Sequence, residues 1–121
     1  MTAATRDDVP VVIEGNGVEV RTQPIGGDLS VGFVRLPKGA DMGPAMQGLP
    51  GDACQCPHWG YLIKGRLKMH TPSGDDVYEA GQAYYWGPGH VPEALEDSEF
   101  VEFSPTEDFR KVVDHVKSQT G

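Results

Sequence analysis

Short apolar runs alternate with turn signals along most of the chain. Runs such as VPVVIE, VEVRT and LSVGFVRL are each about one strand long, and breaks at Asn16-Gly17 and at residues 26–28 separate them. The pattern resumes after residue 57 with HWGYLIKG, RLKMHT, VYEA, AYYWG and EFVEFS. Side chains that alternate between two faces, on short strands joined by tight turns, are typical of antiparallel sheets. The sequence therefore predicts an all-β fold.

Two segments depart from this alternation. Residues 37–52 are dense in glycine and proline and have no clear period, so we expect a long loop there. Near the C-terminal end, apolar side chains recur at the i, i+3, i+4 and i+7 spacing of a helix, at Phe109, Val112, Val113 and Val116. This spacing predicts a helix over about residues 106–118 that lies against the wall formed by the strands.

Length and composition indicate one domain. A chain of 121 residues can bury one core but is too short for a second domain. Residues 1–8 carry little that can be buried, so we expect a flexible N-terminal segment followed by a single domain over residues 9–121, with its strands within residues 9–104. The 16 glycines and 10 prolines agree with the frequent turns of an all-β fold.

The charge excludes several classes of partner. With 18 acidic and 10 basic side chains the formal net charge is −8, whereas binding to nucleic acid or to an anionic membrane needs a concentrated basic face. No apolar run approaches the roughly 18 residues of a membrane span, and the polar start MTAATRDD lacks the apolar stretch of a signal peptide. We therefore expect a cytoplasmic protein that binds neither nucleic acid nor membrane.

Two runs in the second half carry a resemblance to a known family. The run GYLIKGRLKM places Gly65 between two strands, and the run YEAGQAYYWGPGHVPE places Gly81, Pro88 and Gly89 at spaced turns. In these features residues 29–104 resemble the cupins, small β-barrels of the jelly-roll type. The resemblance implies a single cupin-type jelly-roll β-barrel with a C-terminal α-helix. Because cupins host many activities, it defines the function only coarsely.

The resemblance also implies a metal site, although this sequence departs from the ligand pattern of the family. The first cupin motif normally supplies two histidines as HxH and then a glutamate, and the second motif supplies one more histidine. Here the HxH positions fall on Cys54 and Cys56, and the glutamate position falls on His58. The second motif has Pro92 where its histidine is expected, but His90 lies two residues earlier. The predicted metal ligands are therefore Cys54, Cys56, His58 and His90.

Because side chains alternate along a strand, Cys54, Cys56 and His58 should all lie on one face, but their spacing limits which of them can share one metal. Residues at positions i, i+2 and i+4 point the same way and follow one another about 6.6 Å apart. On a straight strand Cys54 and His58 would be on the order of 13 Å apart, too far to share one metal with bonds of about 2.1–2.3 Å. Either the chain bends, for which Pro57 gives a reason, or one of the three residues is not a ligand.

The donor set favours zinc. Two thiolates and two imidazoles are soft ligands that suit Zn(II) best, and copper, iron, manganese and nickel are the alternatives. Four protein ligands would form a closed structural or sensor site, whereas three would leave a position for water or substrate. The open version would support a metal-dependent lyase, isomerase, hydrolase or oxygenase, and the sequence leaves open whether the protein is an enzyme.

Two further residues are candidates for proton transfer. Glu102 in the last strand-like run could accept a proton if it pointed inward, although an outward, solvated carboxylate is the expectation for such a residue. Tyr84 belongs to the aromatic run before the second motif, and one side of that run is expected to line the pocket. By their parity relative to His58, Trp59 and Tyr61 should face away from the cavity.

The sequence leaves three functional hypotheses open. The first is a metal-binding cupin that binds or acts on a small polar molecule entering the barrel. The second is a non-catalytic, metal-stabilised binding or sensor module. The third is a metal-free barrel that binds a small molecule and uses Cys54 and Cys56 as a redox thiol pair. Cupins often pair through sheet edges, so the resemblance also implies a homodimer.

Overall fold

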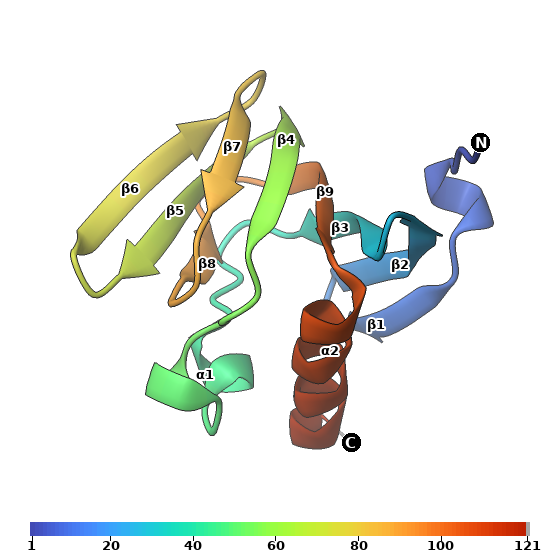
Figure 1. Cartoon of the computed structure of the whole chain (residues 1–121). Helices are drawn as coiled ribbons and strands as arrows, with labels where there is room; N and C mark the ends of the chain where they lie inside the picture. The colour runs from blue at the N-terminus through green and yellow to red at the C-terminus, as the bar shows by residue number, and fades with distance from the viewer. Residues whose placement is uncertain (121) are drawn as a thin grey trace.

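The chain folds into two antiparallel sheets packed face to face, with one long helix at one end (Figure 1). The structure is a computed structural model that describes residues 1–120. Its strands are β1 (Val11–Gly15), β2 (Val18–Gly26), β3 (Leu29–Leu36), β4 (His58–Lys64), β5 (Arg66–Thr71), β6 (Gly74–Glu79), β7 (Ala83–Trp86), β8 (Val91–Ala94) and β9 (Ser98–Pro105). Its helices are α1 (Gly43–Met46) and α2 (Thr106–Thr120), and 3₁₀ turns cover Arg6–Asp8 and Pro50–Asp52.

The larger sheet joins strands from both halves of the chain. Its order is β1-β2-β3-β9-β4-β7, and the smaller sheet has the order β6-β5-β8. The paired strands are antiparallel throughout. Because β9 lies between β3 and β4, the last strand of the chain is held by one strand from the beginning and one from the middle. This arrangement confirms the predicted all-β fold with a C-terminal helix.

Besides the two 3₁₀ turns, the structure adds a short helix and a short strand to the elements that the sequence predicts. Within the expected loop over residues 37–52, α1 forms a single helical turn with Pro44 in its first positions. In the second half, β8 pairs with β5 although it contains Pro92. Proline lacks the N–H group that a strand donates, and β8 accommodates it because this strand lies at an edge of the smaller sheet. The four residues of β8 are also too few to show a clear alternation.

The core lies between the two sheets. On β9 the even-numbered residues are buried and the odd-numbered residues are half-buried or exposed, as expected for a strand with one face in the core. Leu62 of β4 and Leu67 and Met69 of β5 are almost fully buried, and together they connect the larger sheet to the smaller one. Burying each such side chain stabilises the fold by about 1.5–3 kcal/mol.

The helix α2 covers one end of the barrel. Four of its apolar residues are buried and line the cavity inside the barrel: Phe109, Val112, Val113 and Val116. The short helix α1 lies at the same end (Figure 1). The Nε2 atoms of His115 and Gln119 lie 2.7 and 2.8 Å from the carbonyl oxygen of Gln47, just after α1, so side chains of α2 fix the helix to that loop. Within residues 1–120, no helix combines the length and the apolar character needed to cross a membrane.

The N-terminal segment contacts the larger sheet. Arg6 forms an ion pair with Glu19 of β2, and the Thr2 hydroxyl donates a hydrogen bond to the carbonyl of Ile25. Val9 is almost fully buried. The flexibility expected for residues 1–8 and the domain boundary near residue 9 stay predictions.

An ion-paired histidine connects the three strands of the smaller sheet. His70 on β5 lies between Asp75 on β6 and Glu93 on β8, with Nδ1 2.9 Å from Asp75 Oδ1 and Nε2 2.8 Å from Glu93 Oε1. Both ring nitrogens of a histidine donate only when the ring is protonated. The hydrogen bonds to Glu93 and to Asp75 therefore raise the pKa of His70 above its usual range.

We expect the variant His70→Gln to be destabilised in a pH-dependent way. Because the pKa of His70 is raised in the folded state, its contribution is complete below the unfolded value of about 6.5 and is lost as the pH rises through the folded value. Solvent screens this half-exposed cluster, so the contribution is less than about 1 kcal/mol per pair. Urea unfolding at about pH 6 and about pH 9 should give a larger difference from wild type at the lower pH.

The acidic partners provide the control for this experiment. The variants Asp75→Asn and Glu93→Gln each remove the negative charge of one partner of His70, so each should reduce the pH-dependent difference. A loss of stability in His70→Gln that is the same at both pH values would show that packing, and not the charge of His70, carries the effect.

Candidate metal centre

Cross-strand register places a glutamate and a tyrosine inside the larger sheet. Glu102 of β9 lies opposite Gly32 of β3 on one side and opposite Gly60 of β4 on the other, and Gly60 in turn lies opposite Tyr84 of β7. An added Cβ at Gly60 would lie 2.4 Å from the Tyr84 hydroxyl oxygen, so glycine is needed there. Across this glycine the Tyr84 hydroxyl donates a 2.8 Å hydrogen bond to Glu102 Oε1.

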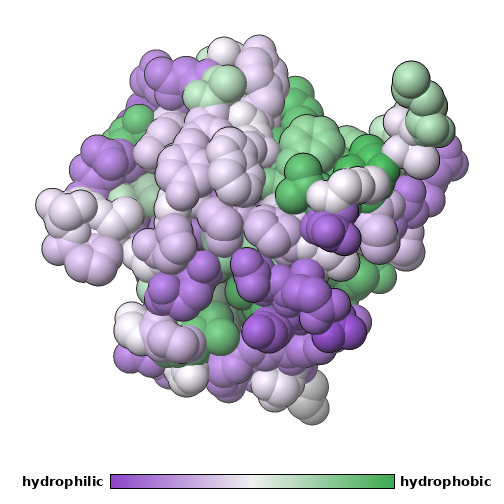
Figure 2. All heavy atoms as spheres, viewed as in Figure 1, coloured by the Kyte–Doolittle hydropathy of each residue, from purple (hydrophilic) through white to green (hydrophobic). Residues whose placement is uncertain are grey.

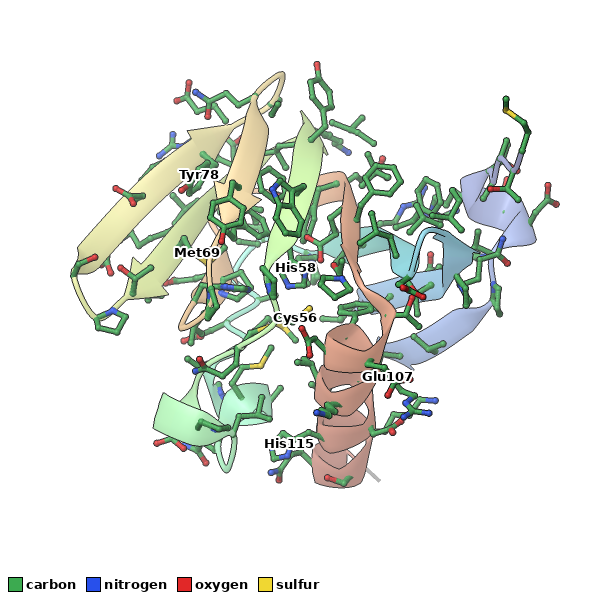
Figure 3. All side chains as sticks on the ribbon, in the orientation of Figure 1. Cys56, His58, Met69, Tyr78, Glu107 and His115 are labelled. Atoms are coloured by element: carbon green, nitrogen blue, oxygen red, sulfur yellow. The ribbon has the colours of Figure 1, made fainter. Side chains whose placement is uncertain are left out.

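His58 occupies the next inner position of β4. It lies opposite Trp86 of β7, and its Nδ1 is 2.6 Å from the hydroxyl oxygen of Ser104 on β9. The same nitrogen lies 3.1 Å from Glu102 Oε2, which is diagonal to it in the sheet. Because residues 102 and 104 share one face of β9, a single strand supplies both partners of this nitrogen. Figure 3 shows His58 in the space between the sheets, above α2.

A backbone bridge brings Cys54 to His90. The Cys54 N–H donates to the His90 carbonyl at 2.9 Å, and the Cys54 carbonyl accepts from the N–H groups of His90 at 3.2 Å and of Gly89 at 2.8 Å. This antiparallel bridge lies outside the named strands. It fixes the loop before β4 against the loop before β8, so two residues far apart in sequence become neighbours.

Three of the four predicted ligands meet inside the barrel. One ligand atom each from Cys54, His58 and His90 lies within 4.8 Å of the other two. Cys54 Sγ is 3.6 Å from His58 Nε2, and the two imidazole rings are 5.0 Å apart between centroids. Cys54, His58 and His90 are 2%, 4% and 3% exposed, respectively. A thiol and two imidazoles that converge in a buried space form a donor set suited to one metal ion.

Both imidazoles are oriented by their second ring nitrogen. The Nδ1 of His58 faces Glu102 and Ser104, and the Nδ1 of His90 lies 2.5 Å from the Gly87 carbonyl oxygen. A carbonyl or a carboxylate accepts, so the proton of each neutral ring belongs on Nδ1 and the lone pair on Nε2. Metal-binding histidines are usually held in this way, with the non-ligating N–H donated to a carboxylate or a backbone carbonyl.

Burial controls the charges of the group. It lowers the pKa of His58 to about 3, and together with the nearby His58 it lowers the pKa of His90 to about 4. Burial raises the pKa of the Cys54 thiol to about 12 and that of Cys56 further. It also raises the pKa of Glu102 to about 7, although the Tyr84 hydroxyl stabilises the carboxylate and limits the rise. At neutral pH the two imidazoles are therefore unprotonated and free to act as ligands.

The chain bends before β4, and the bend changes which residues meet. The outer pair Cys54 and His58 converge, whereas Cys56 between them lies outside the group. Its Sγ is 3.5 Å from the Pro57 carbonyl oxygen, and the side chain lies toward the start of α2 (Figure 3). The parity argument assumed an extended strand through residues 54–58, but regular pairing begins only at His58. The structure therefore brings Cys54, His58 and His90 together and leaves Cys56 outside this group.

The expectation of an outward Glu102 is wrong. Glu102 is 3% exposed and borders the interior cavity, while Tyr84 is buried behind it. A buried carboxylate is costly without partners, and here Tyr84 and His58 supply them from two neighbouring strands. Sequence reasoning also missed Ser104 as a partner of His58. Its parity with Glu102 in the run EFVEFS was the signal that could have indicated it.

The ligand group borders a cavity of about 70 Å³ inside the barrel. Cys54, His58, His90 and Glu102 contribute to its wall, together with apolar residues of the strands and of α2. Tyr84 is not among the described residues that line it. A molecule in this cavity would therefore meet Glu102 directly, and Tyr84 only through Glu102.

Solved structures of several cupins share this fold. An RmlC-like cupin from Shewanella frigidimarina superposes with a TM-score of 0.62 at 16% sequence identity, over 88% of this chain and 93% of that one. KdgF from a Halomonas species gives a TM-score of 0.63 at 22% identity, over 88% and 96%. A mutant of the oxalate decarboxylase OxdC from Bacillus subtilis gives 0.65 at 21% identity, over 87% of this chain but only 29% of that chain. The sequence itself matches no family profile and no curated protein.

These similarities establish the cupin fold for this chain and confirm the resemblance seen in the sequence. The fold and the group of Cys54, His58 and His90 together fit a metal-binding cupin. At identities of 16–22% the fold is what the likeness shows. The chemistry of the site therefore has to be argued from the residues of this chain.

We expect Gly60→Ala to destabilise the fold and Gly32→Ala to be tolerated. Both glycines lie opposite Glu102, but a Cβ at Gly60 would lie 2.6 Å from the Val101 backbone oxygen, whereas one at Gly32 would lie 3.6 Å from the nearest atom of Glu102. Overpacking of this kind costs roughly 1–3 kcal/mol. Urea unfolding of the two variants measures the difference, and equal losses of stability would contradict the role given to Gly60.

Proposed function

We propose that this chain is a small metal-binding protein of the cupin fold. Cys54, His58 and His90 hold a divalent metal, and a small molecule binds or reacts in the adjoining cavity. The observation that carries the proposal is the convergence of three buried ligand atoms within 4.8 Å of one another. The Nδ1 atoms of both histidines are already engaged, which supports metal binding through Nε2.

Zinc is the metal that the donors favour. A thiolate with two imidazoles is a soft set that suits Zn(II), and copper, iron, manganese and nickel remain the alternatives. Three protein ligands are the number found in catalytic zinc sites, where water or substrate takes the remaining position. A metal held here would supply Lewis-acid chemistry. The identity of the metal and the cytoplasmic location stay predictions.

The side chains next to the group support a catalytic version of this function. Glu102 borders the cavity, so its carboxylate can accept a proton from a bound molecule. Tyr84 touches Glu102 and not the cavity, so we give it a positioning role in which it holds one carboxylate oxygen. The reaction class stays within the lyase, isomerase, hydrolase or oxygenase types. The alternative is a non-catalytic sensor built on the same three ligands.

Metal analysis of single variants tests the ligand set. The wild-type protein, purified without added metal and then loaded with zinc, should carry about one zinc per chain. Cys54→Ala, His58→Ala and His90→Ala should each lose most of it, because each removes one of three ligands. Glu102→Gln should keep the site but bind zinc about 10–100-fold more weakly, because Glu102 holds His58.

The variant Cys56→Ala is the matched control. It removes a buried thiol two residues from Cys54 and outside the group, so it should retain the metal. Loss of metal in Cys56→Ala would show that both thiols bind, as the sequence pattern predicted. A wild-type protein that takes up no metal, and whose thiols appear only after mild reduction, would instead support the redox-pair hypothesis.

We further propose a homodimer through the outer face of the larger sheet. Exposed aromatic and aliphatic side chains gather there on β4 and β7: Trp59 (48% exposed), Tyr61 (45%), Ile63 (51%) and Tyr85 (54%). In Figure 2 hydrophobic residues lie beside this patch, in the region of β9 and β3, whereas the surface over α2 is mainly hydrophilic. Apolar patches of this kind mark protein interfaces.

The charges on this face favour a second copy as the partner. Two chains of net charge −8 repel each other except where their surfaces are locally neutral. Arg35 pairs with Glu99 at 2.7 Å and Arg21 pairs with Glu19 at 2.9 Å on the same outer face, so their charges are compensated within one chain. Like copies can therefore approach each other here. Tyr85 lies on the edge strand β7, so the patch reaches an edge of the larger sheet, as edge-based pairing of cupins would require.

We expect the double variant Trp59→Ser, Tyr85→Ser to be monomeric where the wild-type chain is dimeric. The two rings contact each other on the exposed face, with centroids 5.2 Å apart, and are its largest apolar groups. Sedimentation equilibrium measures the mass of both proteins. Val77→Ser is the control, because Val77 is similarly exposed at 48% but lies on β6 of the other sheet. A monomeric wild-type protein at high concentration would contradict the proposal.

A further inference from the structure

The cavity next to the ligand group is apolar apart from that group, the Glu102 carboxyl and the Trp86 indole, whose buried Nε1 has no hydrogen-bond partner among the described residues. The ionisable residues in its wall are Cys54, His58, His90 and Glu102, and none of the described residues that line it is a lysine or an arginine. The rest of the wall consists of aliphatic and aromatic side chains and one proline. Among the described residues that line the cavity, none is positively charged at neutral pH, so a negative charge there can be neutralised only by a metal ion held at Cys54, His58 and His90.

The size of the cavity limits what it can hold. Its volume of about 70 Å³ exceeds the roughly 10–15 Å³ that one water needs and is about half of the 150 Å³ that holds benzene. The space suits a chain of a few carbon atoms. Four residues of α2 close it on one side, so a longer molecule has to extend in another direction.

A second pocket on the surface gives this direction. It has a volume of about 560 Å³ and shares three residues with the inner cavity, namely Ile13, Met42 and Val116. These three side chains therefore form the partition between the two spaces. The wall of the outer pocket includes the polar or charged residues Glu14, Asn16, Lys38 and Asp41 beside apolar ones. The two spaces thus adjoin where the β1–β2 hairpin, the loop before α1 and α2 come together.

We infer that the ligand of this site is a short aliphatic molecule with a single metal-binding head, of the monocarboxylate type. This inference rests on the proposed function, because the head is neutralised at the metal held by Cys54, His58 and His90. The aliphatic part fills the inner cavity, and any further polar group lies beyond Ile13, Met42 and Val116 in the outer pocket. None of the described residues in the wall of the inner cavity is a lysine or an arginine that could pair with a second negative charge.

Butyrate and succinate distinguish this ligand class from small dianions. They have the same number of carbon atoms, but succinate carries a second carboxylate that would be buried among apolar side chains without a cationic partner. Butyrate should therefore bind at least about tenfold more tightly than succinate. Lengthening the chain from acetate to butyrate should strengthen binding by about fourfold per methylene group, because each one is removed from water.

Cobalt(II) in place of the native metal gives a readout that does not depend on activity. The visible absorption of Co(II) reports binding at the ligand group first, and titration with each carboxylate then reports the ligand. A protein that gives no Co(II) spectrum, or the same spectrum in His58→Ala, contradicts the proposed function itself. An intact Co(II) site that binds succinate as well as butyrate, or binds neither, overturns only the present inference.

Two methionines test the entrance. Met42 lines both the inner cavity and the outer pocket, whereas Met46 lines only the inner cavity. Met42→Ala should raise the association rate of butyrate severalfold in stopped-flow measurements on the Co(II) protein. Met46→Ala enlarges the cavity without opening the partition, so the rate should stay near that of wild type while the affinity changes. Equal rates in the two variants would place the entrance elsewhere.

Discussion

The contacts of the His58 Nδ1 with Ser104 and Glu102 of β9 determine how the whole site is arranged. They exist because Glu102 and Ser104 lie on the inner face of β9 while β4 begins at His58. A slip of one residue in β9 would turn both polar side chains outward and place Val101 and Phe103 inside. The pairing of β9 with β3, from Leu29↔Pro105 to Leu36↔Ser98 without a register shift, holds this strand in place.

The same register makes a buried carboxylate tolerable. Removing a carboxylate from water is costly, and the cost is met only when hydrogen-bond donors are already in position. Tyr84 reaches Glu102 across Gly60, and the imidazole of His58 reaches the other oxygen. The contact between Glu102 and His58 therefore serves both residues: it gives the buried carboxylate a partner and it orients the imidazole.

The sequence could predict the strands, the final helix and most of the candidate ligands, but not how they meet. Alternation and turn residues are local signals, and they predict the strands of both sheets apart from β8 with its Pro92. Which of Cys54, Cys56 and His58 converge depends on the bend before β4 and on the bridge from Cys54 to His90, which connects distant segments. The inward position of Glu102 likewise depends on side chains from other strands. An apolar stripe on α2 predicts a buried face, but not that it covers the end of the barrel.

The state of the donors without metal bears on whether the site is structural or open. Burial keeps the Cys54 thiol protonated and both imidazoles neutral at neutral pH, so the metal-free group carries no unpaired charge. The core is meanwhile held by residues that take no part in the group, such as Leu62, Leu67 and Met69 between the sheets. A structural zinc site supplies folding energy that the chain lacks, whereas this barrel has a core of its own. The arrangement therefore favours a site that serves a bound molecule over one that serves the fold.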